Sequence, residues 1–192
     1  MDQGLPGEAG TDDELLCSLG RGCESAWTEF SRRYQGRVYR FALQMTGSRA
    51  LAEEAVQETF MALIDRSGRF DPEKGKAASY VFGIARNKVL DALERERNYL
   101  PLEQDFDAAS GECTERGIDA REENERVRQY VLALPSNYRE AVVLCDLQQL
   151  DYVQAAEAMG CAVGTVRSRL HRGRQLLGEK LATMTERREC RG

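Results

Sequence analysis

The stretch LDYVQAAEAMGCAVGTVRSRLHRGRQLL, residues 150–177, predicts two short helices separated by a turn. Asp151 can cap the first helix, and Gln154 stands three residues later, where a capping box requires it. The first helix has a face of small side chains, and Gly160 permits the left-handed turn that ends it. Small side chains let two helices cross closely, so the pattern predicts a helix-turn-helix.

The second of these helices has two distinct sides. Its buried side is expected to consist of Val166, Leu170, Gly173 and Leu177. Its outward side is expected to consist of Thr165, Arg167, Ser168, His171, Arg172, Arg174 and Gln175. Arginine can donate to guanine in the major groove or to phosphates. A basic helix can also be only a solvated face, but the capped, small-residue helix before it favours contact with DNA.

This basic helix stands out because the chain as a whole is acidic. Its 192 residues, enough for two small domains, include 27 Lys and Arg against 32 Asp and Glu. Residues 99–126 alone contain nine acids and three bases. We therefore expect a disordered tail over residues 1–11 and a flexible acidic linker over 99–118. The charges are segregated, and the average conceals a locally positive surface.

The remaining sequence predicts an all-α protein of two small helical domains, over residues 12–98 and 119–192. The periodicity of apolar residues and the positions of Gly and Pro indicate the helix boundaries. Helices are expected over residues 12–19, 24–46, 49–65 and 77–97, and then over 121–133, 137–147, 152–159 and 164–181. No long segment alternates between apolar and polar residues, so no sheet is expected.

Several classes of protein are disfavoured by composition. No run of 18 apolar residues exists, and the acidic N-terminus has no apolar core, so we expect a cytoplasmic protein without membrane insertion. The six cysteines, at positions 17, 23, 113, 145, 161 and 190, include no Cys-x-x-Cys pair. We expect free thiols, with Cys145 and Cys161 buried, and neither a metal site nor a cofactor. A structural or redox-sensing metal site is the less favoured alternative.

Two blocks of sequence resemble the sigma-70 superfamily of RNA polymerase sigma factors, in its small extracytoplasmic-function group. The first is AEEAVQETFMALI (52–64) followed by FDPEKGKAASYVFGIARNKVLD (70–91), and the second covers residues 134–177. They resemble the second and fourth conserved regions of that family, in the same order. The resemblance implies a protein without enzymatic activity that binds core RNA polymerase, directs it to promoters and helps to melt the −10 element.

The resemblance also assigns roles to residues. Glu54, Gln57 and Glu58 match the surface that binds the clamp coiled coil of the large polymerase subunit. The loop 66–76 and the following helix match the −10 reader, with Lys76, Tyr80, Arg86, Asn87 and Lys88 as its residues. Thr165, Arg167, Ser168, His171, Arg172 and Arg174 match the reader of the −35 element. Relatives are commonly inhibited by an anti-sigma protein, which is therefore a further expected partner.

Each set of candidate site residues also has an alternative interpretation. By composition alone the acidic residues of 52–64 would be a solvated helix face, and Tyr80 a packing residue. An autonomous helix-turn-helix repressor or activator would explain the second domain and leave the first without a role. A helical adaptor that binds only proteins would tolerate neutralisation of Arg167 and Arg172.

Overall fold

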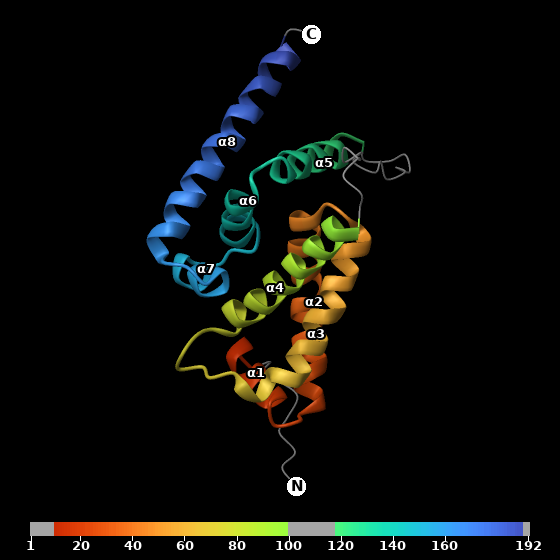
Figure 1. Cartoon of the computed structure of the whole chain (residues 1–192), viewed down its shortest axis with the longest axis vertical. Coiled ribbons are helices and arrows are strands. Elements are labelled where there is room, and N and C mark those ends of the chain that lie inside the picture. Colours follow the sequence, from red (N-terminus) through yellow and green to blue (C-terminus); the bar gives the residue numbers. More distant parts are fainter. Residues whose placement is uncertain (1–9, 100–117, 190–192) are drawn as a thin grey trace.

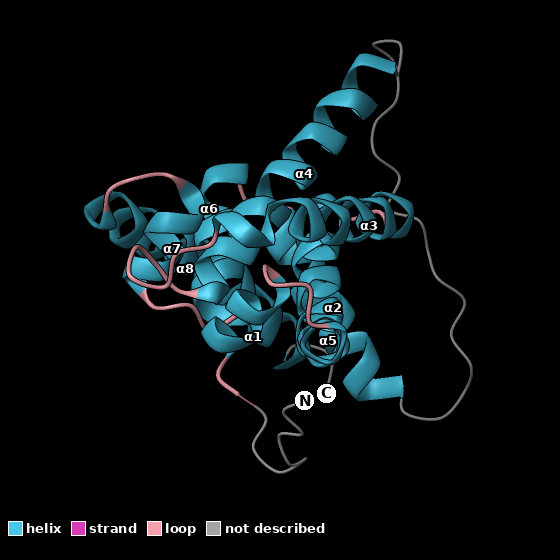
Figure 2. Cartoon of the chain, turned by 90° about the horizontal axis from the view of Figure 1, so that it is seen from below, coloured by secondary structure: helices cyan, strands magenta, loops and turns pink. Residues whose placement is uncertain are grey.

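The computed structural model describes residues 10–99 and 118–189, which form helices joined by short loops, without a β-strand among them (Figures 1 and 2). The first half contains α1 (Asp12–Leu19), α2 (Glu24–Thr46), α3 (Arg49–Arg66) and α4 (Ala77–Tyr99), with a 3₁₀ turn at Ser67–Arg69. The second half contains α5 (Ile118–Leu132), α6 (Ser136–Val142), α7 (Tyr152–Met159) and α8 (Val163–Glu189). The all-α class is confirmed. Most of the expected tail and linker, together with Cys113 and Cys190, lies outside the described residues.

One expected helix differs from the structure. The segment 137–147 is not a single α-helix, because α6 ends at Val142 and the chain continues as a π-helical turn, Val143–Leu147. The following loop contains Gln149 with φ of 60°, the only non-glycine residue of the described ranges with positive φ. The π-helical turn and this loop directly precede the helix-turn-helix.

The helix boundaries follow from local chemistry. The α1 helix begins at a capping box in which the backbone amide of Glu14 donates to the Thr11 hydroxyl and the amide of Thr11 donates to the Glu14 carboxylate. The α7 helix begins in the same way at Asp151 and Gln154, and it ends at Gly160 with φ of 62°. Both features of the helix-turn-helix expected from sequence are confirmed.

Aromatic residues of α2 form the centre of the first half. Phe30, Tyr34 and Phe41 are completely buried, and the rings of Phe30 and Tyr34 stack with centroids 4.6 Å apart. Phe82 of α4 is completely buried and meets Phe41 edge to face at 5.5 Å, so it belongs to the same core. Edge-to-face contacts of this kind add to the free energy gained by burying the rings.

The two halves of the chain pack against each other, which the sequence did not predict. Figure 1 shows α7 beside the N-terminal half of α4, and the buried residues of both halves belong to one hydrophobic cluster. The α4 and α7 helices meet at Gly83, where an added Cβ atom would lie 3.7 Å from the Cα of Ala158. Two arginines add polar contacts: Arg37 donates to the carbonyl of Gln148 at 2.9 Å, and Arg139 to that of Met45 at 2.6 Å.

None of the helices within residues 10–99 and 118–189 combines the length and the apolar character that crossing a membrane requires.

Candidate nucleic-acid interface

The α8 helix presents one side to the protein and the other to solvent, as its sequence predicts. Val166 and Leu170 are buried against the rest of the second half. Gly173 allows α8 to cross α6 closely, because a Cβ atom at this position would lie 2.7 Å from Cγ2 of Val142. The opposite side exposes Arg167, Ser168, His171 and Arg172, whereas Thr165 is half-buried.

The arginines of α8 are not equivalent. Arg174 donates to both carboxylate oxygens of Asp146, at 3.0 and 2.5 Å, and this hydrogen bonding raises the pKa of its guanidinium further. The guanidinium of Arg167 lies 5.5 Å from the ring centroid of Tyr152, and that of Arg172 donates to Gln175 at 2.7 Å. Arg174 therefore ties α8 to the π-helical turn, while Arg167 and Arg172 have no acidic partner among the described contacts.

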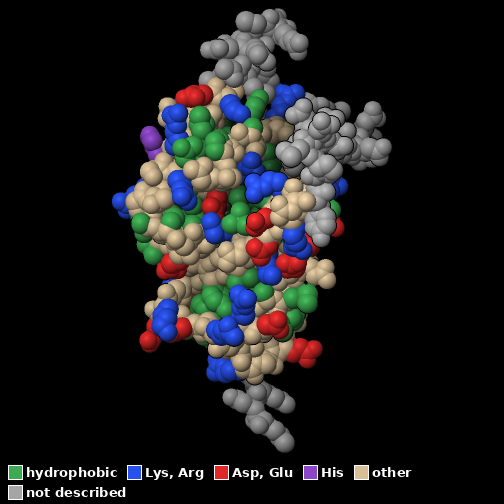
Figure 3. Space-filling model, viewed as in Figure 1, with side chains coloured by type: hydrophobic (Ala, Val, Ile, Leu, Met, Phe, Trp, Pro, Cys, Tyr) green, Lys and Arg blue, Asp and Glu red, His purple; other side chains and the backbone are tan. Residues whose placement is uncertain are grey.

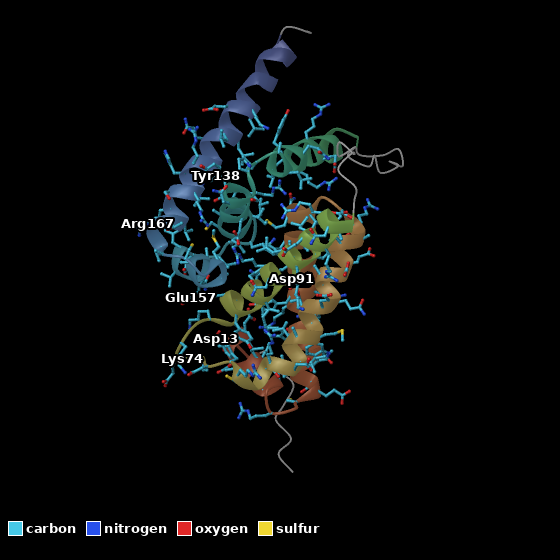
Figure 4. The ribbon with its side chains drawn as sticks, viewed as in Figure 1. Asp13, Lys74, Asp91, Tyr138, Glu157 and Arg167 are labelled. Atoms are coloured by element: carbon cyan, nitrogen blue, oxygen red, sulfur yellow. The ribbon has the colours of Figure 1, made fainter. Side chains whose placement is uncertain are left out.

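We call the exposed set Arg167, Ser168, His171 and Arg172 the basic face. Figure 3 shows the histidine at the edge of the molecule, with lysine and arginine side chains on the same side. Figure 4 shows Arg167 on the outer side of α8, directed away from α4. A helix that projects guanidinium groups on its free side can enter a major groove and contact base edges and phosphates.

The residues of the expected −10 reader lie on α4 or directly before it. All three cations of this set pair with carboxylates. Lys76 pairs with Asp13 at 3.0 Å and Lys88 with Glu58 at 3.2 Å. Arg86 pairs with Glu140, which belongs to α6 of the other half. Sequence reasoning missed these acids, because they are far from α4 in the sequence.

The two uncharged residues of this set differ in environment. Asn87 is exposed on α4, as a side chain that reads a base must be. Tyr80 donates its hydroxyl to the carbonyl of Arg66 at 3.0 Å, and its ring lies 5.5 Å from that of Phe70. Phe70, which sequence reasoning did not single out, thus forms a pair of aromatic rings with Tyr80 at the start of α4.

The three residues of the expected polymerase set on α3 differ in their contacts. Glu54 and Glu58 turn toward α4, where Arg95 donates to them at 2.8 and 3.2 Å. Gln57 is exposed and lines a groove of about 860 Å³ between α2 and α3, whose apolar wall includes Trp27 and Phe60. Of the three residues, Gln57 alone lines this groove.

Two exposed apolar residues extend the Gln57 side of α3. Met61 is 59% exposed and Ile64 is 58% exposed, and with Gln57 they follow the i, i+4, i+7 spacing of one helix face. Large apolar side chains so far exposed are typical of a surface that binds another protein.

The described cysteines do not gather into a site. Within the described ranges, no three His, Cys, Asp or Glu side chains lie close enough together to hold a metal ion. Cys17, Cys23, Cys145 and Cys161 are free thiols. Burial raises the pKa of Cys145 to about 11, whereas a hydrogen bond with Ser25 lowers that of the exposed Cys23. Cys145 and Cys161 are half-buried rather than fully buried.

Geometry alone defines a helical protein with a helix-turn-helix whose second helix has an exposed basic face. Comparison with known families narrows this class. Residues 30–99 match the family described as sigma-70 region 2, and residues 124–177 match the family described as sigma-70, region 4. The two matches fall on α2 to α4 and on α5 to α8, respectively.

Curated relatives align with most of the chain. It is 33% identical over 161 residues to the ECF RNA polymerase sigma factor SigE of Mycolicibacterium smegmatis, an alignment that covers 82% of this chain and 62% of that protein. It is 31% identical over 153 residues to the ECF sigma factor SigM of Bacillus subtilis, covering 78% of this chain and 91% of SigM. It is also 30% identical over 166 residues to the sigma factor CarQ of Myxococcus xanthus, covering 82% and 92% of the two chains.

Two solved structures share the fold. CnrH, in a complex with the cytosolic domain of CnrY, is matched with a TM-score of 0.70 at 23% identity, over 90% of this chain and 97% of that one. The sigma factor RpoE of Bartonella quintana, in a complex with the anti-sigma factor NepR, is matched with a TM-score of 0.64 at 23% identity, over 81% and 96%. The chain therefore belongs to the ECF group of the sigma-70 family. Its function is that of a transcription initiation sigma factor, which binds core RNA polymerase and promoter DNA.

Proposed function

We propose that the basic face of α8 reads the −35 element as duplex DNA, and that α4 with the preceding loop 66–76 reads the melted −10 element. The proposal rests on one observation. One side of α8 is buried and holds the helix in place, while Arg167 and Arg172 on its other side remain exposed. Base edges and phosphates in a major groove require donors arranged in this way.

The −10 reader is supported by the aromatic pair Tyr80 and Phe70 beside the cations of α4. Single-stranded DNA is bound by surfaces on which aromatic rings offer stacking and cations follow the backbone. The exposed amide of Asn87 can both donate and accept hydrogen bonds, as reading a base edge requires. Lys76, Arg86 and Lys88 would exchange their carboxylate partners for phosphates.

Binding to polymerase is proposed for the side of α3 that carries Gln57. The exposed Met61 and Ile64 and the apolar groove beside Trp27 provide the apolar centre that protein interfaces need. Glu54 and Glu58 belong to the border of this surface, because they are held by Arg95. The partner is the clamp coiled coil of the large polymerase subunit.

We also propose two functional units, residues 12–98 and 119–192, connected through 99–118. Sigma factors are generally non-catalytic regulators of transcription, and in this chain we assign no catalytic residues, because the chemistry of RNA synthesis belongs to the polymerase. The protein would act in the cytoplasm, where polymerase and DNA are found. Since the solved relative RpoE is bound by an anti-sigma factor, we propose that this chain is regulated by such a partner as well.

A gel-shift experiment tests the proposed function. At near-physiological salt, the protein alone should form little complex with promoter duplex, and addition of core polymerase should produce a clear one. A single recognition helix supplies less surface than specific complexes usually need, and polymerase combines the two readers as a linked pair. Tight, sequence-specific binding by the protein alone would instead identify an autonomous regulator.

A further inference from the structure

The α1 helix contacts both ends of the loop 66–76, which joins α3 to α4. Figure 1 shows α1 beside this loop. The side chain of Asp13, near the start of α1, contacts the end of the loop, and Gly20, directly after α1, meets its beginning. The loop and the start of α4 belong to the proposed −10 reader, whereas the sequence suggests no function for α1.

The carboxylate of Asp13 caps α4 from outside that helix. One of its oxygens accepts from the backbone amide of Ala77 at 2.7 Å, and the other from the ammonium group of Lys76 at 3.0 Å. Ala77 is the first residue of α4, and the first amides of an α-helix have no partner within their own helix. Figure 4 shows Asp13 near the beginning of α4. The cap does not depend on Lys76, so it persists when Lys76 exchanges its partner for a phosphate.

The other end of α1 lies against the 3₁₀ turn where the loop begins. A Cβ atom on Gly20 would lie 3.0 Å from the Cα of Gly68 and 3.0 Å from the carbonyl oxygen of Ser67, which are both backbone atoms. The φ of Gly20 is −61°, a conformation that any residue adopts. The close approach of the turn, and not the backbone conformation, therefore requires glycine at this position. A side chain here would displace the turn.

The α1 helix is itself anchored on α2. Leu16 is completely buried, and the carboxylate of Asp12 accepts from the hydroxyl of Tyr34 at 2.7 Å and from the guanidinium of Arg33 at 2.8 Å. Two adjacent acids thus hold two different helices, since Asp12 contacts α2 and Asp13 contacts α4. From Asp13 to the end of α1 the helix rises by about 10 Å. It therefore acts as a rigid spacer between the two ends of the loop.

The aromatic pair of the proposed −10 reader depends on the same two ends. Phe70 directly follows the 3₁₀ turn that packs against Gly20, and Tyr80 lies in the first turn of α4, which Asp13 caps. The two rings lie 5.5 Å apart, and the hydroxyl of Tyr80 donates to the carbonyl of Arg66 at 3.0 Å. The distance between the two ends of the loop therefore determines how the rings meet.

We propose that α1 is a positioning element of the −10 reader: Asp13 and Gly20 set the geometry of the loop 66–76, and so the preference for −10 bases, without contacting DNA. This rests on the proposed role of the loop and α4 as the −10 reader. A binding surface discriminates well only if its groups are held within about 0.5 Å of their productive positions. Displacement of either end therefore changes the ratios between −10 sequences, whereas a folding defect lowers transcription from all promoters equally.

The test compares variants at the two ends of α1 with matched controls, each as the full chain assembled with core polymerase. Asp13→Ala removes the cap of α4, while Asp13→Asn keeps an oxygen that can accept from the amide of Ala77. Gly20→Ala displaces the 3₁₀ turn. As controls, Glu24→Ala removes an exposed acid of α2, and Gly178→Ala adds a methyl group where no atom lies within 4 Å.

Transcription is measured from promoters with single-base changes in the −10 element and from a second set with changes in the −35 element. Loss of a helix cap typically changes an equilibrium by about threefold or more. In Asp13→Ala and in Gly20→Ala, the ratio between −10 variants should change by a similar factor at one position or more, with unchanged −35 ratios. Asp13→Asn should lie closer to the parent chain than Asp13→Ala, and both controls should match the parent. Because each value is a ratio, it does not depend on the fraction of chain that is folded.

Unchanged −10 ratios in both Asp13→Ala and Gly20→Ala, or a loss of transcription that is equal at every promoter, would overturn the positioning role. Asn87→Ala, measured with the same promoters, distinguishes this result from a failure of the proposed function. If Asn87→Ala alters the −10 ratios and the α1 variants do not, only the role of α1 is wrong. If Asn87→Ala leaves them unchanged as well, the assignment of the −10 reader fails, and the role of α1 with it.

Discussion

The ammonium group of Lys88 lies 3.2 Å from the carboxylate of Glu58, so a residue of the expected −10 reader is paired with one of the expected polymerase surface. Glu58 also accepts from Arg95, and although burial opposes the change, Lys88 and then Arg95 lower the pKa of its carboxyl group. Both side chains of the pair are 30% exposed. Substitution of Glu58 would therefore disturb two surfaces at once, and it is a poor probe of either.

Gln57 is the cleaner probe of the polymerase surface. Gln57→Ala removes an exposed side chain beside the groove between α2 and α3 and breaks no ion pair of α3. We expect affinity for core polymerase to fall about tenfold, which corresponds to about 1.4 kcal/mol, with an unchanged melting temperature. Quantitative binding to labelled core measures this. Asn98→Ala, at an exposed position near the end of α4, serves as the control, and equal affinities for both variants would show that Gln57 lies outside the interface.

Asn87 tests the reading of the −10 element. Asn87→Ala should reduce the formation of open complexes and relax the preference for one −10 base, because the amide is removed while the helix remains. Transcription from a set of single-base −10 variants gives the preference at each position. Asp91→Ala, one turn further along α4 and also exposed, should leave the profile unchanged. A wild-type profile for Asn87→Ala would exclude the assignment.

The arginines of α8 should separate into two kinds. Arg167→Ala and Arg172→Ala should each weaken the holoenzyme at −35-dependent promoters, and the salt slope of binding should fall by about one for each phosphate that is no longer neutralised. Arg174→Ala should leave the slope unchanged, because Arg174 is held by Asp146. Since that pair is partly exposed, its removal should lower stability by no more than about 1 kcal/mol. Salt titrations compare the three variants, and identical slopes would contradict the distinction.

Two glycines of α8 provide a matched pair for the packing of the helix. Gly173→Ala should destabilise the protein by about 1–3 kcal/mol, because its Cβ atom would lie 2.7 Å from Val142 and force α8 away from α6. Gly178→Ala meets no atom within 4 Å and should stabilise the helix by about 0.5–1 kcal/mol. Denaturant unfolding measures both changes. A stabilising Gly173→Ala would mean that the two helices do not cross so closely.

The thiols should differ in reactivity. At pH 8, a pKa of about 11 leaves roughly one Cys145 side chain in a thousand as the reactive thiolate. Reactivity of Cys145 should therefore rise as the pH increases toward 11, while the exposed Cys23, with its lowered pKa, should react at lower pH than Cys145. Peptide mapping after brief alkylation gives the order. Faster labelling of Cys145 than of Cys23 would contradict its burial.

The cysteines should also be dispensable for transcription. A variant with Ser or Ala at all six positions should still drive promoter-specific transcription, because no spacing in the sequence supports a metal site. Stoichiometric zinc in the purified protein, lost together with activity, would show that the cysteines hold a metal that transcription requires.

Most helices could be predicted from the sequence because the signals that start and end them come from neighbouring residues. The caps at Asp151 and Gly160 depend on neighbouring residues only, and the apolar spacing of α2 depends on helical geometry alone. The π-helical turn after Val142 has no such local signal, which is why a continuous helix was expected there. The contact between Arg86 and Glu140 spans 54 positions and two domains, and no periodicity within either segment encodes it.

The candidate sites could be predicted in part for the same reason. Exposure of Arg167 and His171 follows from their positions opposite Val166 and Leu170 on one helix. The ion pair of Arg174 with Asp146 depends on how α8 packs against the π-helical turn. The sequence places Arg174 and Arg172 on the same outward side of α8, so it could not predict that only Arg174 is paired. Likewise, the groove beside Gln57 exists only because α2 and α3 lie side by side.

The two-sided construction of α8 also has an evolutionary consequence. The residues that anchor the helix, Val166, Leu170 and Gly173, share no position with Ser168, His171 and Arg172 on its free side. Under the proposed reading of the −35 element by this face, mutations on the free side would alter the preferred promoter without weakening the packing of α8. A duplicated gene for this chain could acquire a new set of target genes one substitution at a time, with every intermediate still folded and available to selection.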